Sequence, residues 1–129
     1  MRVWLYARLS NDDDREMNSL LNQREICQAF AEQHRYTIVG QSFDDNISGM
    51  SFDRRGLDEL MVAVDADKID AVIAKDLSRL GRHRTQTALF IDYLRKHQVR
   101  VISATEGVDT FRDEDDLIIG VRGLMNDYY

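Results

Sequence analysis

A serine and an arginine lie close together near the start of the chain, in the segment Tyr6-Ala7-Arg8-Leu9-Ser10. The apolar run from Val3 to Ala7 predicts a buried strand, so Tyr6, Arg8 and Ser10 are expected on one side of its carboxyl end. A hydroxyl beside a guanidinium can serve as a nucleophile. A serine followed by one asparagine and three aspartates is, however, more often a turn or a helix cap. This segment alone therefore favours a structural interpretation.

Two further segments place arginines where predicted strands end. One is Lys75-Asp76-Leu77-Ser78-Arg79-Leu80-Gly81-Arg82-His83-Arg84, and the other is Asp53-Arg54-Arg55-Gly56. Arg79 and Arg82 are three residues apart, so they would share one face of a helical turn. Arginine binds phosphate oxygens through two parallel hydrogen bonds and keeps its charge at any working pH. Each run alone is typical of a solvated basic loop, but arginines at three successive strand exits indicate a shared phosphate-binding site.

Predicted strands and helices alternate along the whole chain. Strands are predicted at residues 3–7, 36–43, 69–74 and 99–104. Helices are predicted at residues 17–34 and 85–97, after Asp53 as an N-cap, and from near residue 113. The apolar stripes of these helices include Leu21, Ala88 and Leu89. The alternation predicts an α/β fold of three layers, in which a mostly parallel central sheet carries helices on both faces and binds ligands at the carboxyl ends of its strands.

Length and composition are those of one globular domain. The chain has 129 residues, of which 43% are hydrophobic and 31% are charged, and no apolar run approaches the roughly 20 residues of a membrane span. The absence of a secretory leader pattern and the single Cys27, expected as a small core residue, favour a reducing cytoplasm. The net charge of −6 argues against strong DNA binding by this domain alone, so a local basic site on an acidic body is expected.

The last predicted helix is apolar on more than one stripe up to Tyr129. Such a helix indicates either a continuing chain, a surface for a partner subunit, or packing against its own sheet, and the sequence leaves these open. The acidic runs Asp12–Asp14 and Asp113–Asp116 are typical of helix starts.

Taken together, the three arginine-bearing segments resemble the motifs of one protein family. Tyr6-Ala7-Arg8-Leu9-Ser10 is similar to the nucleophile segment of the resolvase/invertase family of serine recombinases. Ser48-Gly49 with Asp53-Arg54-Arg55-Gly56-Leu57 resembles its second motif, and Lys75-Asp76-Leu77-Ser78-Arg79-Leu80-Gly81-Arg82 resembles its third. Order and spacing agree over nearly the whole chain, which makes the combination far more specific than any single motif.

The resemblance implies an activity, a site and partners. Ser10 would attack a DNA phosphodiester and form a covalent 5′-phosphoserine, and neither a metal ion nor a small-molecule cofactor would be needed. The implied partners are a double-stranded DNA crossover site and a homodimer that pairs into a synaptic tetramer, with no membrane. Residues 1–129 would form the catalytic domain, with a dimerisation helix starting near residues 113–129 and the DNA-binding domains outside this chain. The implied phosphate ligands are Arg8, Arg54, Arg79 and Arg82, with Tyr6, Gln23 and Asp45 as supporting residues.

Two positions depart from common family patterns. Ser78 stands where many small resolvases carry an acidic residue directly before the first arginine of the third motif, so any acid role there must be absent or moved. Arg55 stands where large members often have proline. The Ser78 pattern is more similar to the large serine recombinases of mobile elements, which favours that branch.

Two other classes of function fit parts of the sequence. Asp44, Asp45 and Asp76 follow predicted strands and could hold Mg²⁺ in a receiver-like phosphotransfer domain, although the first strand exits into Arg8 and Ser10 instead of an acidic ligand. A non-catalytic interaction module could use the arginines to bind an acidic partner and the last helix to dimerise. The three histidines, His34, His83 and His97, are not spaced as metal ligands.

Overall fold

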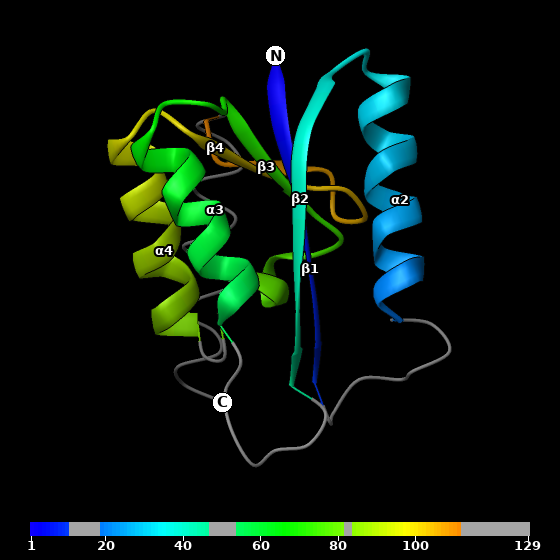
Figure 1. Ribbon diagram of the computed structural model, residues 1–129, viewed down its shortest axis with the longest axis horizontal. Helices are drawn as coiled ribbons and strands as arrows, with labels where there is room; N and C mark the ends of the chain where they lie inside the picture. Colours follow the sequence, from blue (N-terminus) through cyan, green and yellow to red (C-terminus); the bar gives the residue numbers. More distant parts are fainter. Residues whose placement is uncertain (11–18, 47–53, 82–83, 112–129) are drawn as a thin grey trace.

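The computed structural model describes residues 1–10, 19–46, 54–81 and 84–111 (Figure 1). They form one five-stranded sheet in the order β2-β1-β3-β4-β5. The strands are β1 (Arg2–Ser10), β2 (Thr37–Asn46), β3 (Ala71–Ala74), β4 (Arg100–Ser103) and β5 (Val108–Asp109). Strands β1 to β4 are parallel, and β5 runs antiparallel to β4. The prediction of an α/β fold with a mostly parallel sheet is confirmed, whereas the two-residue β5 is too short to have left a periodic pattern in the sequence.

Helices cover both faces of this sheet, as predicted (Figure 1). Helix α2 (Leu20–Gln33) lies on one face, and α3 (Arg55–Asp65) and α4 (Arg84–Lys96) lie together on the other. A short 3-10 helix, η1 (Leu77–Leu80), follows β3 directly. None of the helices in the described part of the chain has the length and apolar content that crossing a bilayer requires.

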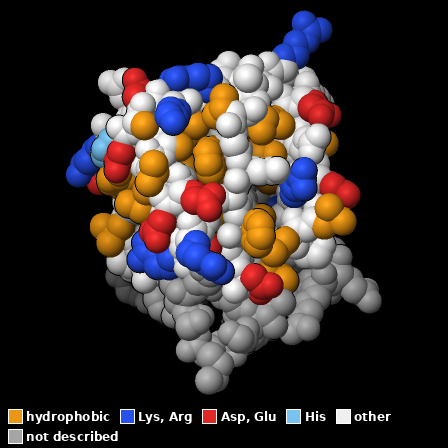
Figure 2. All heavy atoms as spheres, in the orientation of Figure 1, with side chains coloured by type: hydrophobic (Ala, Val, Ile, Leu, Met, Phe, Trp, Pro, Cys, Tyr) orange, Lys and Arg blue, Asp and Glu red, His pale blue; other side chains and the backbone are white. Residues whose placement is uncertain are grey.

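Each face of the sheet has its own apolar cluster. On the α2 side, Cys27 and Ala31 pack against residues of β1, β3 and β4. On the other side, Leu60 of α3 and Leu94 of α4 are fully buried within a larger cluster that also contains Tyr6 of β1. The outer surface mixes acidic and basic side chains over the face seen in Figure 2, without a large area of one sign.

The apolar stripes of two helices are narrower than predicted. Leu21 on α2 is 61% exposed and Leu89 on α4 is 65% exposed, and Ala88 is also exposed. Leu21 is two residues from the buried Gln23, and Leu89 is two residues from the buried Ile91. Two residues on a helix are about 200° apart at 3.6 residues per turn, so these leucines face solvent. They lie on the predicted helices but outside the buried stripe of each.

The N-terminus of α3 is capped from a neighbouring strand. The predicted N-cap, Asp53, lies outside the described residues, and the N-cap position belongs to Arg54, which makes no side-chain capping bond. Instead Asp44 of β2, which is fully buried, accepts hydrogen bonds from the amides of Gly56 (2.7 Å) and Leu57 (3.0 Å). The Asp44 carboxylate therefore satisfies two of the first-turn donors of α3.

Strand β1 continues beyond the end of its neighbour β3. It pairs with β3 only from Val3 to Leu5, whereas its pairing with β2 continues to Ser10, which lies opposite Asn46. The last part of β1 thus has a strand on one side only. Other groups must satisfy the backbone on the opposite side.

Gly56 lies where α3 approaches β2 closely. A Cβ atom at this position would lie 2.4 Å from the carbonyl oxygen of Phe43, which is a backbone atom and cannot rotate away. We expect Gly56→Ala to lower the free energy of unfolding by about 2 kcal/mol or more. Urea unfolding measures this change. Val62→Ala on the same helix is the control, because Val62 is 68% exposed; its effect is expected to stay within about 0.5 kcal/mol. Equal effects of the two variants would contradict the packing described.

Candidate active site

A glutamine takes the place of a strand beside the end of β1. Gln23 of α2 is fully buried, and its Oε1 accepts a hydrogen bond from the backbone N–H of Arg8 (3.1 Å). Its Nε2 donates to the carbonyl of the same residue (2.8 Å). A carboxamide offers one acceptor and two donors, so it can pair with a peptide unit as a neighbouring strand would. Gln23 therefore keeps β1 extended up to Ser10.

The side chain of Arg8 connects β1 to the segment after β3. It is buried, and its Nη2 donates to the carbonyl of Ser78 and to the carbonyl of Gly81 (3.1 Å). These two carbonyls belong to a residue within η1 and to the residue just after it. Because one partner is charged, such bonds are stronger than bonds between neutral groups. The guanidinium thus fixes η1 against the exit of β1.

Arg79 makes the reciprocal connection from η1 back to β1. It is 4% exposed, and its Nη1 donates to the carbonyl of Arg8 (2.9 Å). Its Nε and Nη2 both donate to Oδ2 of Asp76 (3.3 Å each). The structure therefore brings Arg8 and Arg79, which come from two different strand exits, into one buried cluster. Two guanidinium groups therefore lie in this cluster, and one of them is paired with the Asp76 carboxylate.

Two carboxylates hold the start of η1. Asp76 is its N-cap and accepts from the amide (3.1 Å) and the hydroxyl of Ser78. Glu106, in the turn between β4 and β5, accepts from the amide of Leu77 (2.9 Å) and from the hydroxyl of Ser103 (2.7 Å). The turn that carries Arg79 is thus anchored at both of its first amides.

Tyr6 connects β1 to the start of α3. Its hydroxyl donates to Oδ2 of Asp44 (2.6 Å), the residue that caps α3. Arg54 lies immediately before α3 and is exposed, and no described contact joins it to Arg8 or Arg79. Asp44 therefore fixes the backbone next to Arg54, but the Arg54 side chain is exposed and is not part of the buried cluster.

The remaining predicted site residues lie around the same strand exits. Ser10 is the last residue of β1, two positions after Arg8, and its side chain lies outside the description. Asp45 is exposed on β2 and pairs in register with Leu9. Arg82 also lies outside the described residues, directly after Gly81.

The geometry of the aspartates does not favour the receiver-like alternative. The Asp44 carboxylate accepts from a hydroxyl and two amides, and the Asp76 carboxylate accepts from Ser78 and Arg79. Oxygens that accept from N–H and O–H groups in this way are oriented toward donors and not toward a cation. Within the ranges that the structure describes, no three His, Cys, Asp or Glu side chains gather as metal ligands.

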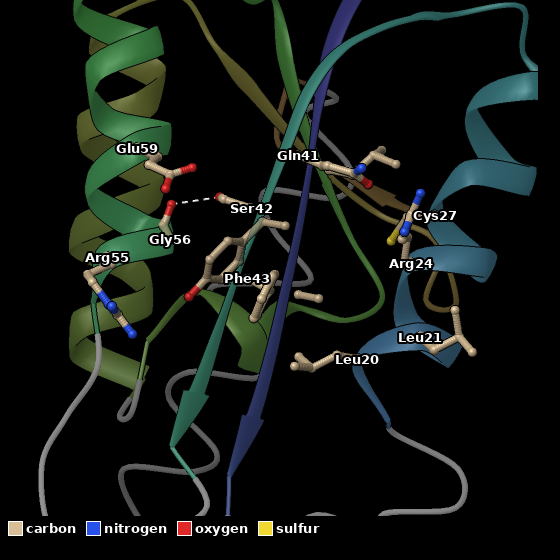
Figure 3. A pocket seen from close by; sticks show the side chains of 13 residues that line it. Leu20, Leu21, Arg24, Cys27, Gln41, Ser42, Phe43, Arg55, Gly56 and Glu59 are labelled. Carbon is tan, nitrogen blue, oxygen red and sulfur yellow. Dashed lines mark hydrogen bonds between the residues drawn. The ribbon is translucent and has the colours of Figure 1, made fainter.

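A hollow of about 690 Å³ lies next to this cluster, around the edge strand β2 (Figure 3). It is lined from α2 by Leu20, Leu21 and Arg24, and from α3 by Arg55 and Glu59. Neither Arg8 nor Arg79 lines it. The hollow is therefore a surface feature beside the arginine cluster and not the cluster itself.

Sequence reasoning missed the carboxylates that hold these arginines in place. Asp44 and Asp76 were considered only as metal ligands, and Glu106 was not considered. An aspartate directly before the first apolar residue of a helical turn is a capping signal that could have indicated Asp76. Nothing local marks Asp44 or Glu106, because their partners are distant in sequence.

Comparisons with known proteins identify the family of the chain and its fold. The family described as "Resolvase, N terminal domain" matches residues 3–129. The transposon Tn3 resolvase of Escherichia coli is 28% identical over 121 residues, which are 94% of this chain but only 60% of that relative. A resolvase family site-specific recombinase from Streptococcus pneumoniae has a TM-score of 0.81 at 27% identity and covers 99% of this chain and 87% of its own. The N-terminal catalytic domain of TP901-1 integrase has a TM-score of 0.79 at 22% identity, covers 99% and 95%, and shows the shared fold.

The hydrogen bonds of Gln23 give a direct test of how β1 is held. Gln23→Ala would leave the N–H and C=O of Arg8 without these partners inside the protein, so we expect a loss of about 2 to 4 kcal/mol of stability. Hydrogen exchange at the Arg8 amide should accelerate more than exchange in β4. Gln28→Ala, at an exposed position of the same helix, is the control and should change neither quantity. An unchanged Arg8 amide would show that Gln23 does not hold the strand.

Cys27 predicts a dependence of stability on high pH. Burial raises the pKa of its thiol from 9.0 to about 12. Because the folded value is the higher one, the stability contributed by the protonated thiol is full below pH 9 and is lost as the pH rises from 9 toward 12. The melting temperature should therefore fall more steeply with pH across this range for the native protein than for Cys27→Ala. Parallel curves for the two proteins would contradict this assignment.

Proposed function

The chain belongs to the resolvase family, and we propose that it is the catalytic domain of a site-specific DNA recombinase in which Ser10 is the nucleophile. The observation that supports this most strongly is the cross-connection of Arg8 and Arg79 at the end of β1, two residues before Ser10. Such a pair of fixed cations is suited to a phosphodiester. The match over residues 3–129 includes all three motifs that carry these residues.

In the proposed reaction, the Ser10 hydroxyl oxygen attacks the phosphorus of the scissile phosphodiester. A new bond forms between phosphorus and the serine oxygen, and the bond from phosphorus to the 3′ oxygen breaks. The serine gives up its proton and the leaving 3′ oxygen takes one, which yields a 5′-phosphoserine and a free 3′-hydroxyl. Attack by a 3′-hydroxyl on the phosphoserine reverses these steps. Because one phosphodiester replaces another, strands can be rejoined without a nucleotide cofactor.

The arginines are proposed to stabilise the charge of this reaction. Phosphoryl transfer is catalysed mainly by positioning and by stabilisation of charge on the non-bridging oxygens. Guanidinium groups can supply that stabilisation without a metal ion. The proposed phosphate ligands are Arg8, Arg54, Arg79 and Arg82, with Tyr6, Gln23 and Asp45 in supporting roles.

The proposed substrate is a double-stranded DNA crossover site. The relatives named above, a transposon resolvase, a family recombinase and an integrase, support this class of substrate. The chain spans 60% of the length of the transposon resolvase, so we propose that DNA-binding segments outside residues 1–129 supply most of the affinity. We further propose a homodimer that uses residues 113–129, pairs into a synaptic tetramer, and acts in the cytoplasm as part of a large serine recombinase.

Replacement of the nucleophile tests the proposal. In a reaction of the full-length protein with its crossover site, stopped by denaturation, the native protein should become linked to a DNA 5′ end even in the presence of a chelator. Ser10→Ala should lose this linkage by at least about a thousandfold, because the substitution removes the proposed attacking oxygen. Denaturing gels of end-labelled DNA measure the linked species.

Ser19→Ala is the matched control for this experiment. It removes the hydroxyl that caps α2, which accepts from the Asn22 amide (3.0 Å), and should cost only about 1 kcal/mol of stability while the linkage still forms. An undiminished linkage in Ser10→Ala would contradict the proposal. A folded native protein that binds the site but never becomes linked would favour a non-catalytic interaction module.

A further inference from the structure

Asp76 is a carboxylate that bonds directly to an arginine of the buried cluster. Its Oδ2 accepts from Nε and Nη2 of Arg79 at 3.3 Å each. Arg79 in turn donates through Nη1 to the carbonyl of Arg8 (2.9 Å). The planar guanidinium is therefore held along two of its edges, by a carboxylate on one and by the exit of β1 on the other.

The second oxygen of Asp76 has a different task. Its Oδ1 accepts from the amide and the hydroxyl of Ser78, which caps η1. Asp76 thus combines a backbone cap with an ion pair to Arg79. The Asp76 side chain is only 24% exposed. An ion pair that is mostly shielded from water is screened less than a surface pair, so it can fix the orientation of Arg79.

We propose that Asp76 is a positioning residue, which sets the orientation of the Arg79 guanidinium at the exit of β1. This inference rests on the proposed function, because orientation matters for catalysis only if Arg79 meets the phosphate. Asp76 would then act through Arg79 and not on the DNA itself. Ser78 stands where many small resolvases carry an acidic residue. On this account Asp76, two residues before Ser78, supplies the carboxylate instead, and it accepts a hydrogen bond from the Ser78 hydroxyl.

The cap and the ion pair can be separated by one substitution. Asparagine caps helices about as well as aspartate, so Asp76→Asn should keep the bond to the Ser78 amide. It removes the charge that faces Arg79. A purely structural role for Asp76 therefore predicts little change in Asp76→Asn. A positioning role predicts that the DNA linkage forms more slowly, by on the order of tenfold to a hundredfold. The loss of a hydrogen bond to a charged group would raise the reaction barrier by an amount that corresponds to this change in rate.

A double-mutant cycle shows whether Asp76 acts through Arg79. Arg79→Lys removes the planar fork that Asp76 orients, so Asp76→Asn should slow the linkage no further in that background. Asp92→Asn is the control, because it makes the same chemical change in an exposed pair with Lys96 (3.2 Å) and should leave the rate unchanged. Additive effects of Asp76→Asn and Arg79→Lys would overturn the inference.

A measurement on the free protein separates this inference from the proposed function. The ¹⁵N-bound Nε proton of Arg79 should exchange with water at least about tenfold faster in Asp76→Asn than in the native protein, because a charged acceptor is lost. Circular dichroism of the same samples should show an unchanged fold. Unchanged exchange would overturn the inference whether or not the protein cleaves DNA. Faster exchange in a protein that never links to DNA would leave Asp76 as the partner that orients Arg79 and would overturn only the proposed function.

Discussion

The site depends on how the unpaired side of β1 is satisfied beyond the end of β3. Where a strand extends past the end of its neighbour, its backbone N–H and C=O groups on that side must bond to other protein groups or to water. Here the carboxamide of Gln23 bonds both backbone groups of Arg8, and Arg79 adds a third bond to the same carbonyl. The end of β1 is therefore rigid although it lacks a strand on that side.

The same contacts that complete the strand also gather the charges. Arg8 bonds to carbonyls within η1 and just after it, and Arg79 bonds back to β1, so neither arginine can move without disturbing the other segment. Two carboxylates hold the helices that follow the neighbouring strands: Asp44 caps α3 and Asp76 caps η1. Buried guanidinium groups are tolerated because each has hydrogen-bond partners in the protein. Fold stability and site geometry thus rest on one network.

Much of the fold could be predicted from local patterns, whereas the supports of the site could not. Alternating apolar runs identified four strands and the helices between them, because period and length are local properties. The arginines were recognisable because they recur at strand exits. The contribution of Asp44 to the cap of α3 could not be predicted, since nothing in the sequence shows that β2 passes the start of α3. Leu21 and Leu89 could not be separated from the buried stripes, because an apolar residue beside a buried stripe looks the same in sequence as one within it.

The most direct test of the account is to identify the atom that carries the DNA. Trypsin should release the peptide Leu9–Arg15 from a trapped and nuclease-treated reaction, and Ser10 is the only hydroxyl-bearing residue in that peptide. Mass spectrometry should find the 5′ nucleotide attached there through a phosphate, in a reaction that contains a chelator. Attachment at any other residue would contradict the central claim. So would an unmodified peptide from DNA that has been cut.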